Sequence, residues 1–84
     1  VPPLNEERRI ELVKIVKKKS EDAKISIRNV RRNAMDEVKD SEKKGELSQD
    51  DSRRMQSDIQ KNTDESIEEI SKIAQNKENE LMEV

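Results

Sequence analysis

The feature that most constrains the fold of this chain is the placement of its helix-breaking residues. Proline occurs only at positions 2 and 3, where it predicts an extended lead-in over residues 1–4, and the single glycine is Gly45. Two stretches of about forty residues are therefore free of the two residue types that most disfavour an α-helix. The connection around Gly45 is short, so the two helices have to form an antiparallel helical hairpin.

Residues that favour helix ends stand at the ends of both stretches. Asn5 is a good N-cap for the first helix, and Gly45 lies where a left-handed residue commonly follows a helix. Ser48 is a good N-cap for the second helix, and acidic residues follow it in the first turn. We therefore expect helices over about 6–44 and about 48–82.

The spacing of the apolar residues favours order over disorder. Composition leaves both open, because 29% of the residues are hydrophobic, none is aromatic and 45% are charged. The apolar residues, however, recur at spacings of three, four or seven, as they do on one side of a helix. They are Leu12, Val16, Ala23, Ile27, Val30, Ala34 and Val38 in the first stretch, and Met55, Ile59, Ile70, Ile73 and Leu81 in the second. Asn62 or Thr63 and Ser66 give the second stripe a polar centre.

Two apolar stripes of this size are too small to hold a hairpin together alone. Each stripe meets one neighbouring helix in a hairpin, while ordering every residue costs conformational entropy. The expected fold is therefore all-α, with the antiparallel two-helix hairpin forming part of a three-helix bundle. The third helix would come from a bundle segment outside this chain or from self-association.

The sequence lacks the residues that most enzyme active sites need. Without His or Cys, the usual nucleophile–base pairs and tetrahedral zinc sites are excluded, and one glycine cannot make a phosphate-binding loop. The adjacent acids Asp50–Asp51 and Glu68–Glu69 are interpreted as capping residues and as a solvated surface. We expect no enzyme activity, no catalytic residue, no metal and no cofactor. No apolar run approaches the about 18 residues of a membrane span.

Basic residues gather in the first half of the chain. Residues 1–44 hold 13 Lys and Arg against 9 Asp and Glu, whereas residues 45–84 hold 5 against 11. On a helix, Lys17, Lys24, Arg28 and Arg31 share one side, with Lys14 and Arg32 flanking it, about 120° from the apolar stripe. They are therefore predicted to point outward.

Arginine guanidinium groups bind phosphate through paired hydrogen bonds, so this pattern favours RNA or DNA binding. The candidate RNA-binding residues, called the basic stripe below, are Arg28, Arg31, Arg32, Lys24 and Lys17. Two other interpretations stay open. The stripe is either a solvated surface balanced by the acidic second helix, or a membrane-surface helix that lacks anchoring Trp and Phe.

Several motifs resemble the C-terminal part of ribosome recycling factor, and the resemblance covers essentially all 84 residues. They are Pro-Pro-Leu-Asn-Glu-Glu-Arg-Arg at 2–9, Arg-Asn-Val-Arg-Arg-Asn-Ala at 28–34, Leu-Ser-Gln-Asp-Asp at 47–51, Gln-Lys-Asn-Thr-Asp at 60–64 and Lys-Glu-Asn-Glu-Leu-Met-Glu-Val at 77–84. The chain departs from the family pattern at Asn33–Asp36, where Met35 is predicted to lie on the basic side.

The resemblance implies a fold and a function. In that family a β-rich insertion separates the first helix of a three-helix bundle from the other two, and this chain would supply the other two. The family's bundle lies against large-subunit rRNA of the ribosome and, with elongation factor G, splits post-termination ribosomes into subunits. Arg28, Arg31 and Arg32 match its rRNA-contacting patch. Localisation would be cytoplasmic, or in an organellar stroma or matrix.

A different class of function competes with this one. The chain could be a structural coiled-coil or adaptor fragment with no RNA role, whose basic stripe pairs with acidic partners. Binding to ribosomes or structured RNA that weakens with salt distinguishes the two.

Overall fold

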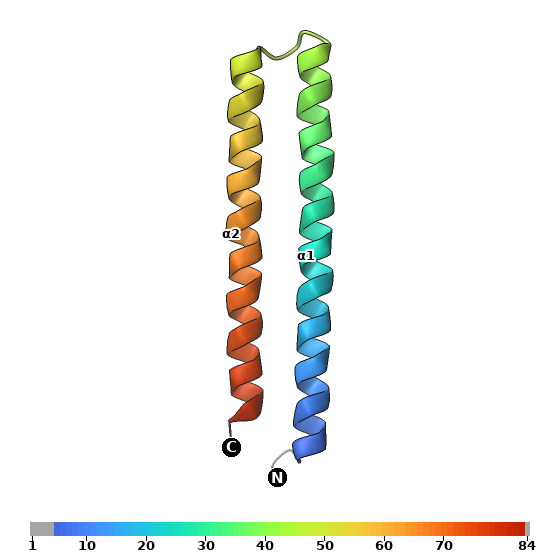
Figure 1. The fold of residues 1–84 in the computed structure, drawn as a ribbon, viewed down its shortest axis with the longest axis vertical. Helices are drawn as coiled ribbons and strands as arrows, with labels where there is room; N and C mark the ends of the chain where they lie inside the picture. The colour runs from blue at the N-terminus through green and yellow to red at the C-terminus, as the bar shows by residue number, and fades with distance from the viewer. Residues whose placement is uncertain (1–4, 84) are drawn as a thin grey trace.

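The computed structural model describes residues 5–83 as a rod of two antiparallel α-helices, α1 (Glu6–Lys43) and α2 (Gln49–Met82), as Figure 1 shows. The rod measures 64 × 15 × 15 Å, and its radius of gyration is 19.1 Å. A compact domain of this length would have a radius of gyration of about 12 Å. The predicted all-α hairpin is confirmed, while the lead-in predicted for residues 1–4 lies outside the described residues.

Both helices begin at the N-cap residues that the sequence predicts. The side-chain oxygen of Asn5 accepts a hydrogen bond of 2.7 Å from the backbone N–H of Arg8. The hydroxyl oxygen of Ser48 likewise accepts a hydrogen bond of 3.0 Å from the N–H of Asp51. Each cap satisfies a backbone donor that has no partner within its helix.

Helix α1 ends in a Schellman motif built on Gly45. Gly45 has a φ of 78°, the left-handed conformation that the sequence predicts for it. The N–H of Gly45 donates to the carbonyl of Glu42 at 3.1 Å, and the N–H of Glu46 donates to the carbonyl of Ser41 at 2.9 Å. These two bonds satisfy terminal carbonyls of α1 and reverse the chain toward α2.

The seam between the helices is thin. Within the described residues only Val38, Ser52 and Thr63 are buried, and most other seam residues are half-buried. Thr63 occupies the polar centre of the α2 stripe, while Asn62 and Ser66 are exposed. The Thr63 hydroxyl donates to the carbonyl of Ile59 at 2.7 Å, so its burial leaves no unpaired donor.

Three apolar residues expected in the stripes lie outside this seam. Val30 is 67% exposed, Ile73 is 61% exposed and Met55 is 41% exposed. The reason is geometric: each stripe is wider than one neighbouring helix can cover, so α2 covers one side of the α1 stripe and leaves the other side open. Ile67, which the apolar spacing did not single out, is half-buried in the seam.

The uncovered side is an open apolar groove along the hairpin. It has two parts. One is lined by Ile27, Val30, Ala34 and Ile59 together with Arg31, Asn62, Thr63 and Ser66. The other is lined by Val16, Ala23, Ile70, Ile73 and Ala74 together with Lys19, Ser20 and Lys77. We call the two parts together the apolar groove. That the hairpin needs a further neighbour in this groove stays a prediction.

Gly45 provides a test of the turn. Gly45→Ala should lower the free energy of unfolding by about 1–2 kcal/mol, because alanine disfavours the left-handed conformation. Apart from Gly45 itself and its two chain neighbours, nothing lies within 4 Å of the position that an added Cβ would take, so a steric clash adds nothing. Gly45→Asn is the matched control and should cost less, since asparagine tolerates this conformation. Thermal melts followed by circular dichroism measure both, and equal losses would contradict the left-handed turn.

The apolar groove provides a second test. Because the seam covers so little apolar surface, the helical content of the 84-residue chain should rise with concentration as a further helix fills the groove. Circular dichroism and sedimentation over a range of concentrations measure this. A fully helical monomer at micromolar concentration would show that the hairpin needs no neighbour.

Candidate nucleic-acid interface

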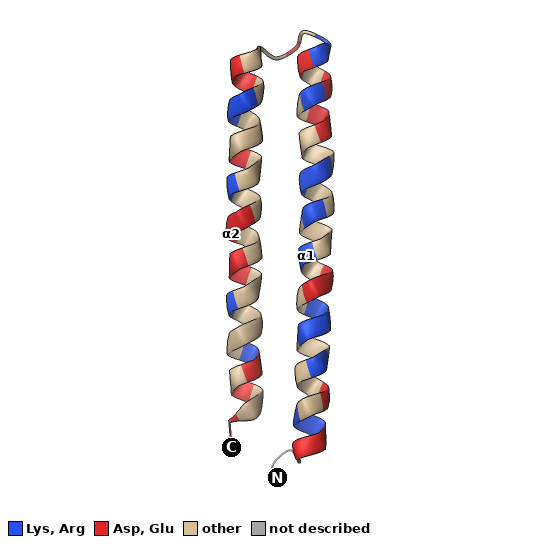
Figure 2. Ribbon diagram, in the orientation of Figure 1, with Lys and Arg blue, Asp and Glu red and all other residues tan. Residues whose placement is uncertain are grey.

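The two helices carry opposite net charge; Figure 2 marks their basic residues in blue and their acidic residues in red. Helix α1 has twelve Lys and Arg against nine Asp and Glu, whereas α2 has five against nine. The seven ion pairs of residues 5–83 all join residues three or four apart in the sequence, within a helix or between α1 and its C-cap Lys44. In this part of the chain no ion pair connects α1 with α2, so no acid of α2 forms an ion pair with the basic stripe.

The C-terminal part of the basic stripe lies in a stretch without acids. Residues 23–35 contain Lys24, Arg28, Arg31 and Arg32 but no Asp or Glu, and we call this stretch the acid-free window. Four basic residues therefore lie within about 12 Å along the helix axis, since each residue rises about 1.5 Å.

Three members of the stripe are exposed, although one of them, Lys17, also borders a groove between the helices. Lys17, Arg28 and Arg32 are exposed, and none of them belongs to an ion pair among residues 5–83. Arg28 and Arg32 are one helical turn apart and both lie in the acid-free window. Their guanidinium groups are therefore available to an external anion.

The outward placement predicted for Lys24 and Arg31 is wrong. The Lys24 side chain is only 18% exposed, and its ammonium nitrogen lies 3.7 Å from a carboxylate oxygen of Glu21. Arg31 is half-buried, and its Nε donates a hydrogen bond of 2.7 Å to Oε1 of Gln60 on α2. Both differences have the same cause: α2 packs on the side of the apolar stripe nearest the basic residues. Met35, expected on the basic side, is half-buried for the same reason.

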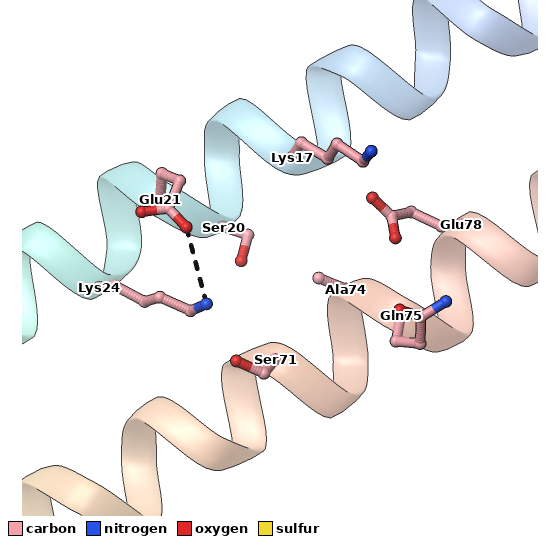
Figure 3. Close-up of a pocket in the computed structure, with 8 residues that line it drawn as sticks. All are labelled: Lys17, Ser20, Glu21, Lys24, Ser71, Ala74, Gln75 and Glu78. Carbon is pink, nitrogen blue, oxygen red and sulfur yellow. Dashed lines mark ion pairs between the residues drawn. The ribbon is translucent and has the colours of Figure 1, made fainter.

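The N-terminal part of the stripe borders a polar groove between the helices, drawn in Figure 3. Lys17, Ser20, Glu21 and Lys24 line it from α1, and Ser71, Ala74, Gln75 and Glu78 line it from α2. The Glu78 side chain points across the groove toward α1, on the side of Lys17 (Figure 3). Acids therefore accompany Lys17 and Lys24, whereas Arg28 and Arg32 have none in their own stretch of α1.

Two residues beside the stripe, Gln60 and Asp64, were not predicted from the sequence. Gln60 accepts the hydrogen bond from Arg31, and the Nε2 of Gln60 donates a bond of 2.9 Å to Oδ1 of Asp64. Gln60 and Asp64 are four residues apart, which is the spacing of an amide–carboxylate pair on one side of a helix. That signal is present in the sequence, but nothing in it shows that Gln60 meets Arg31.

Two further kinds of site are absent from the described residues. Over residues 5–83, His, Cys, Asp and Glu form no group of three or more that could hold a metal ion. No helix within that range is long and apolar enough to cross a membrane.

The fold and its charges define the class of this chain: a long, highly charged helical hairpin that presents one basic helix and one acidic helix. Comparison with known proteins then identifies the family. A profile of the ribosome recycling factor family matches residues 1–82. The chain belongs to the ribosome recycling factor family.

Three curated relatives illustrate the similarity, and each is named ribosome-recycling factor. The protein of Bacillus cytotoxicus is 59% identical over 99% of this chain. Those of Geobacillus sp. strain WCH70 and Halalkalibacterium halodurans are 56% and 54% identical over 100% of it. In each case the match covers 45% of the relative, so the chain spans about half the length of the curated relatives it matches.

Arg31 and Arg28 provide a test of this geometry, because only Arg31 contacts α2. Arg31→Glu removes the bond to Gln60 and places a carboxylate beside the Gln60 amide oxygen, so the free energy of unfolding should fall by about 1 kcal/mol or more. Arg28→Glu makes the same charge change on the exposed surface and should cost under about 0.5 kcal/mol. Paired thermal melts measure the difference, and equal stability of the two variants would show that the bond contributes nothing.

Proposed function

We propose that this chain forms the last two helices of the helical-bundle domain of a ribosome recycling factor and binds large-subunit rRNA without catalysis. Family membership and the exposed arginines of α1 support this role. For the complete protein that contains these helices, we propose the splitting of post-termination ribosomes together with elongation factor G. The protein would then act where ribosomes are, in the cytoplasm or in an organellar stroma or matrix.

The observation that carries the RNA-binding role is the acid-free window. Arg28 and Arg32 are exposed there without an ion-pair partner among the described residues, so binding a phosphate would not require either to break an existing pair. A planar guanidinium can donate two parallel hydrogen bonds to one phosphate. A-form RNA displays its phosphates and 2′-hydroxyl groups while its deep major groove excludes side chains, so we expect recognition of shape with little dependence on sequence.

The apolar groove supports the proposed place in a bundle. It is open along one side of both helices and exposes Val30 and Ile73, which a third helix would cover. We propose a bundle helix from elsewhere in the complete protein as its occupant, with a second copy of the chain as the substitute when that helix is absent. At about 100° per residue, Arg28 and Arg32 lie on a different side of α1 from the groove residues Val30 and Ala34, so filling the groove leaves both arginines exposed.

Charge reversal at the exposed arginines tests the RNA-binding role. The double variant Arg28→Glu with Arg32→Glu should bind large ribosomal subunits at least about tenfold more weakly, because two phosphate contacts become repulsive. The matched control is Arg53→Glu with Lys61→Glu, which makes the same change in net charge on exposed residues of α2 that belong to no ion pair in residues 5–83. The control should bind nearly as well as the parent chain. Binding is measured by sedimentation, with helicity checked by circular dichroism.

The salt dependence of the parent chain separates this role from a structural adaptor. On an RNA duplex, the logarithm of the affinity should fall with the logarithm of the salt concentration by roughly 0.9 for each phosphate neutralised. Affinity that does not change with salt, or equal losses in the two charge-reversal variants, would favour the adaptor function.

A further inference from the structure

We infer that Gln60 is a positioning residue for Arg31, so that the phosphate-binding site spans both helices instead of lying on α1 alone. The inference rests on the proposed function, since it concerns how the same surface holds an RNA phosphate. It assigns a role to α2, which the sequence pattern marks as the acidic, non-binding helix. Three observations support it. The Gln60 amide bonds to both Arg31 and Asp64, the terminal nitrogens of the Arg31 guanidinium remain available, and Arg28 and Arg32 form no hydrogen bond to α2.

The chemistry of its neighbours fixes the orientation of the Gln60 amide. An ionised carboxylate can only accept hydrogen bonds, so the amide nitrogen has to face Asp64, where Nε2 lies 2.9 Å from Oδ1. The amide oxygen then has to face the other way, toward Arg31, whose Nε can only donate and lies 2.7 Å from it. A flipped amide would set donor against donor at Arg31 and acceptor against acceptor at Asp64. Asp64 thus fixes Gln60, and Gln60 fixes Arg31.

This bond leaves the outer end of the guanidinium available. With Nε committed to Gln60, the two terminal nitrogens remain, and they form the end that can bind one phosphate through parallel hydrogen bonds. A free arginine loses up to about 2 kcal/mol of side-chain entropy when it is immobilised. Here α2 has already restricted the side chain before RNA binds, so less of that cost falls on the binding step.

Gln60 also separates two opposite charges. It stands between the guanidinium of Arg31 and the carboxylate of Asp64, each bonded to one end of its amide. Without this spacer, Asp64 could accept directly from Arg31 and neutralise it. Gln60 therefore keeps a positive charge available on a side of the hairpin where α2 also presents an acid.

The bond has no counterpart elsewhere in the stripe. Among residues 5–83 it is the single side-chain to side-chain hydrogen bond that connects α1 with α2, whereas Arg28 and Arg32 have no bond to α2. The placement of Arg31 therefore depends on the two helices being paired in this register. Binding through Arg31 is coupled to formation of the hairpin, and binding through Arg28 and Arg32 is not tied to α2 in this way.

A double-mutant cycle in the 84-residue chain tests the inference, with large ribosomal subunits as the probe. The cycle compares the parent, Gln60→Met, Arg31→Ala and the double variant, at concentrations where circular dichroism shows full helicity. Methionine keeps the length of glutamine and favours helix, but its thioether is only a weak acceptor in place of the amide oxygen. Gln60→Met should weaken binding about three- to tenfold in the parent, a usual coupling between contacting residues, and should have no effect when Arg31 is already Ala.

Salt dependence separates positioning from direct contact. Arg31→Ala removes a charge, so the slope of log affinity against log salt should become shallower by roughly 0.9 on a duplex. Gln60→Met leaves every charge in place, so its slope should equal that of the parent while its affinity is lower. The control is Gln56→Met, because Gln56 is also half-buried on α2 but donates to Ser52 of the same helix. It should bind like the parent.

The outcomes distinguish this inference from the function on which it rests. If Gln60→Met weakens binding equally with and without Arg31, Gln60 acts through folding or by direct contact, and the inference is overturned. It is also overturned if Gln60→Met binds like the parent while reversal of Arg28 and Arg32 still abolishes binding, and the proposed function then survives. If that reversal has no effect, the proposed function itself fails.

Discussion

The constraint on which the rest of this structure depends is that each helix of an isolated hairpin has one neighbour. A helix can bury only the part of its surface that faces that neighbour, and among residues 5–83 the buried residues are Val38, Ser52 and Thr63. Apolar residues beyond that contact, such as Val30 and Ile73, stay exposed in the apolar groove. The rod shape, the thin seam and the exposed apolar groove all follow from this one limit.

The same limit explains how charge is distributed. A rod that is 15 Å across leaves most of each helix in water, so long charged side chains are tolerated nearly everywhere. Ion pairs form along each helix and leave the two helices with opposite net charge. Arg28 and Arg32 have no ion-pair partner among residues 5–83, and this costs little free energy because solvent screens their charges. A surface of this kind can serve an anionic partner without weakening the fold that carries it.

Local rules in the sequence predicted the parts of this structure that depend on a few adjacent residues. Asn5, Ser48 and Gly45 are such cases, because capping and left-handed turns are decided within one helical turn. Periodicity predicted two helices and most of the seam, but it gives the width of an apolar stripe and not which side of it a neighbour will cover. The side of the stripe that α2 covers determines whether Val30 is exposed and whether Arg31 contacts α2. The Arg31–Gln60 bond joins residues 29 apart in sequence, so it depends on how the helices pair.

The position of the turn also determines how the free-energy cost of pairing the two helices changes along the rod. Contacts near Gly45 join residues close in sequence, whereas the bond from Arg9 to the carbonyl of Met82 joins residues 73 apart. The entropy lost on closing a chain segment grows with its length, so pairing is least costly beside the turn and most costly at the far end. Pairing of the two helices should therefore begin beside the turn and extend toward the two ends of the chain. Backbone amides should exchange with solvent slowly near Val38 and Ser52, and progressively faster toward the two termini.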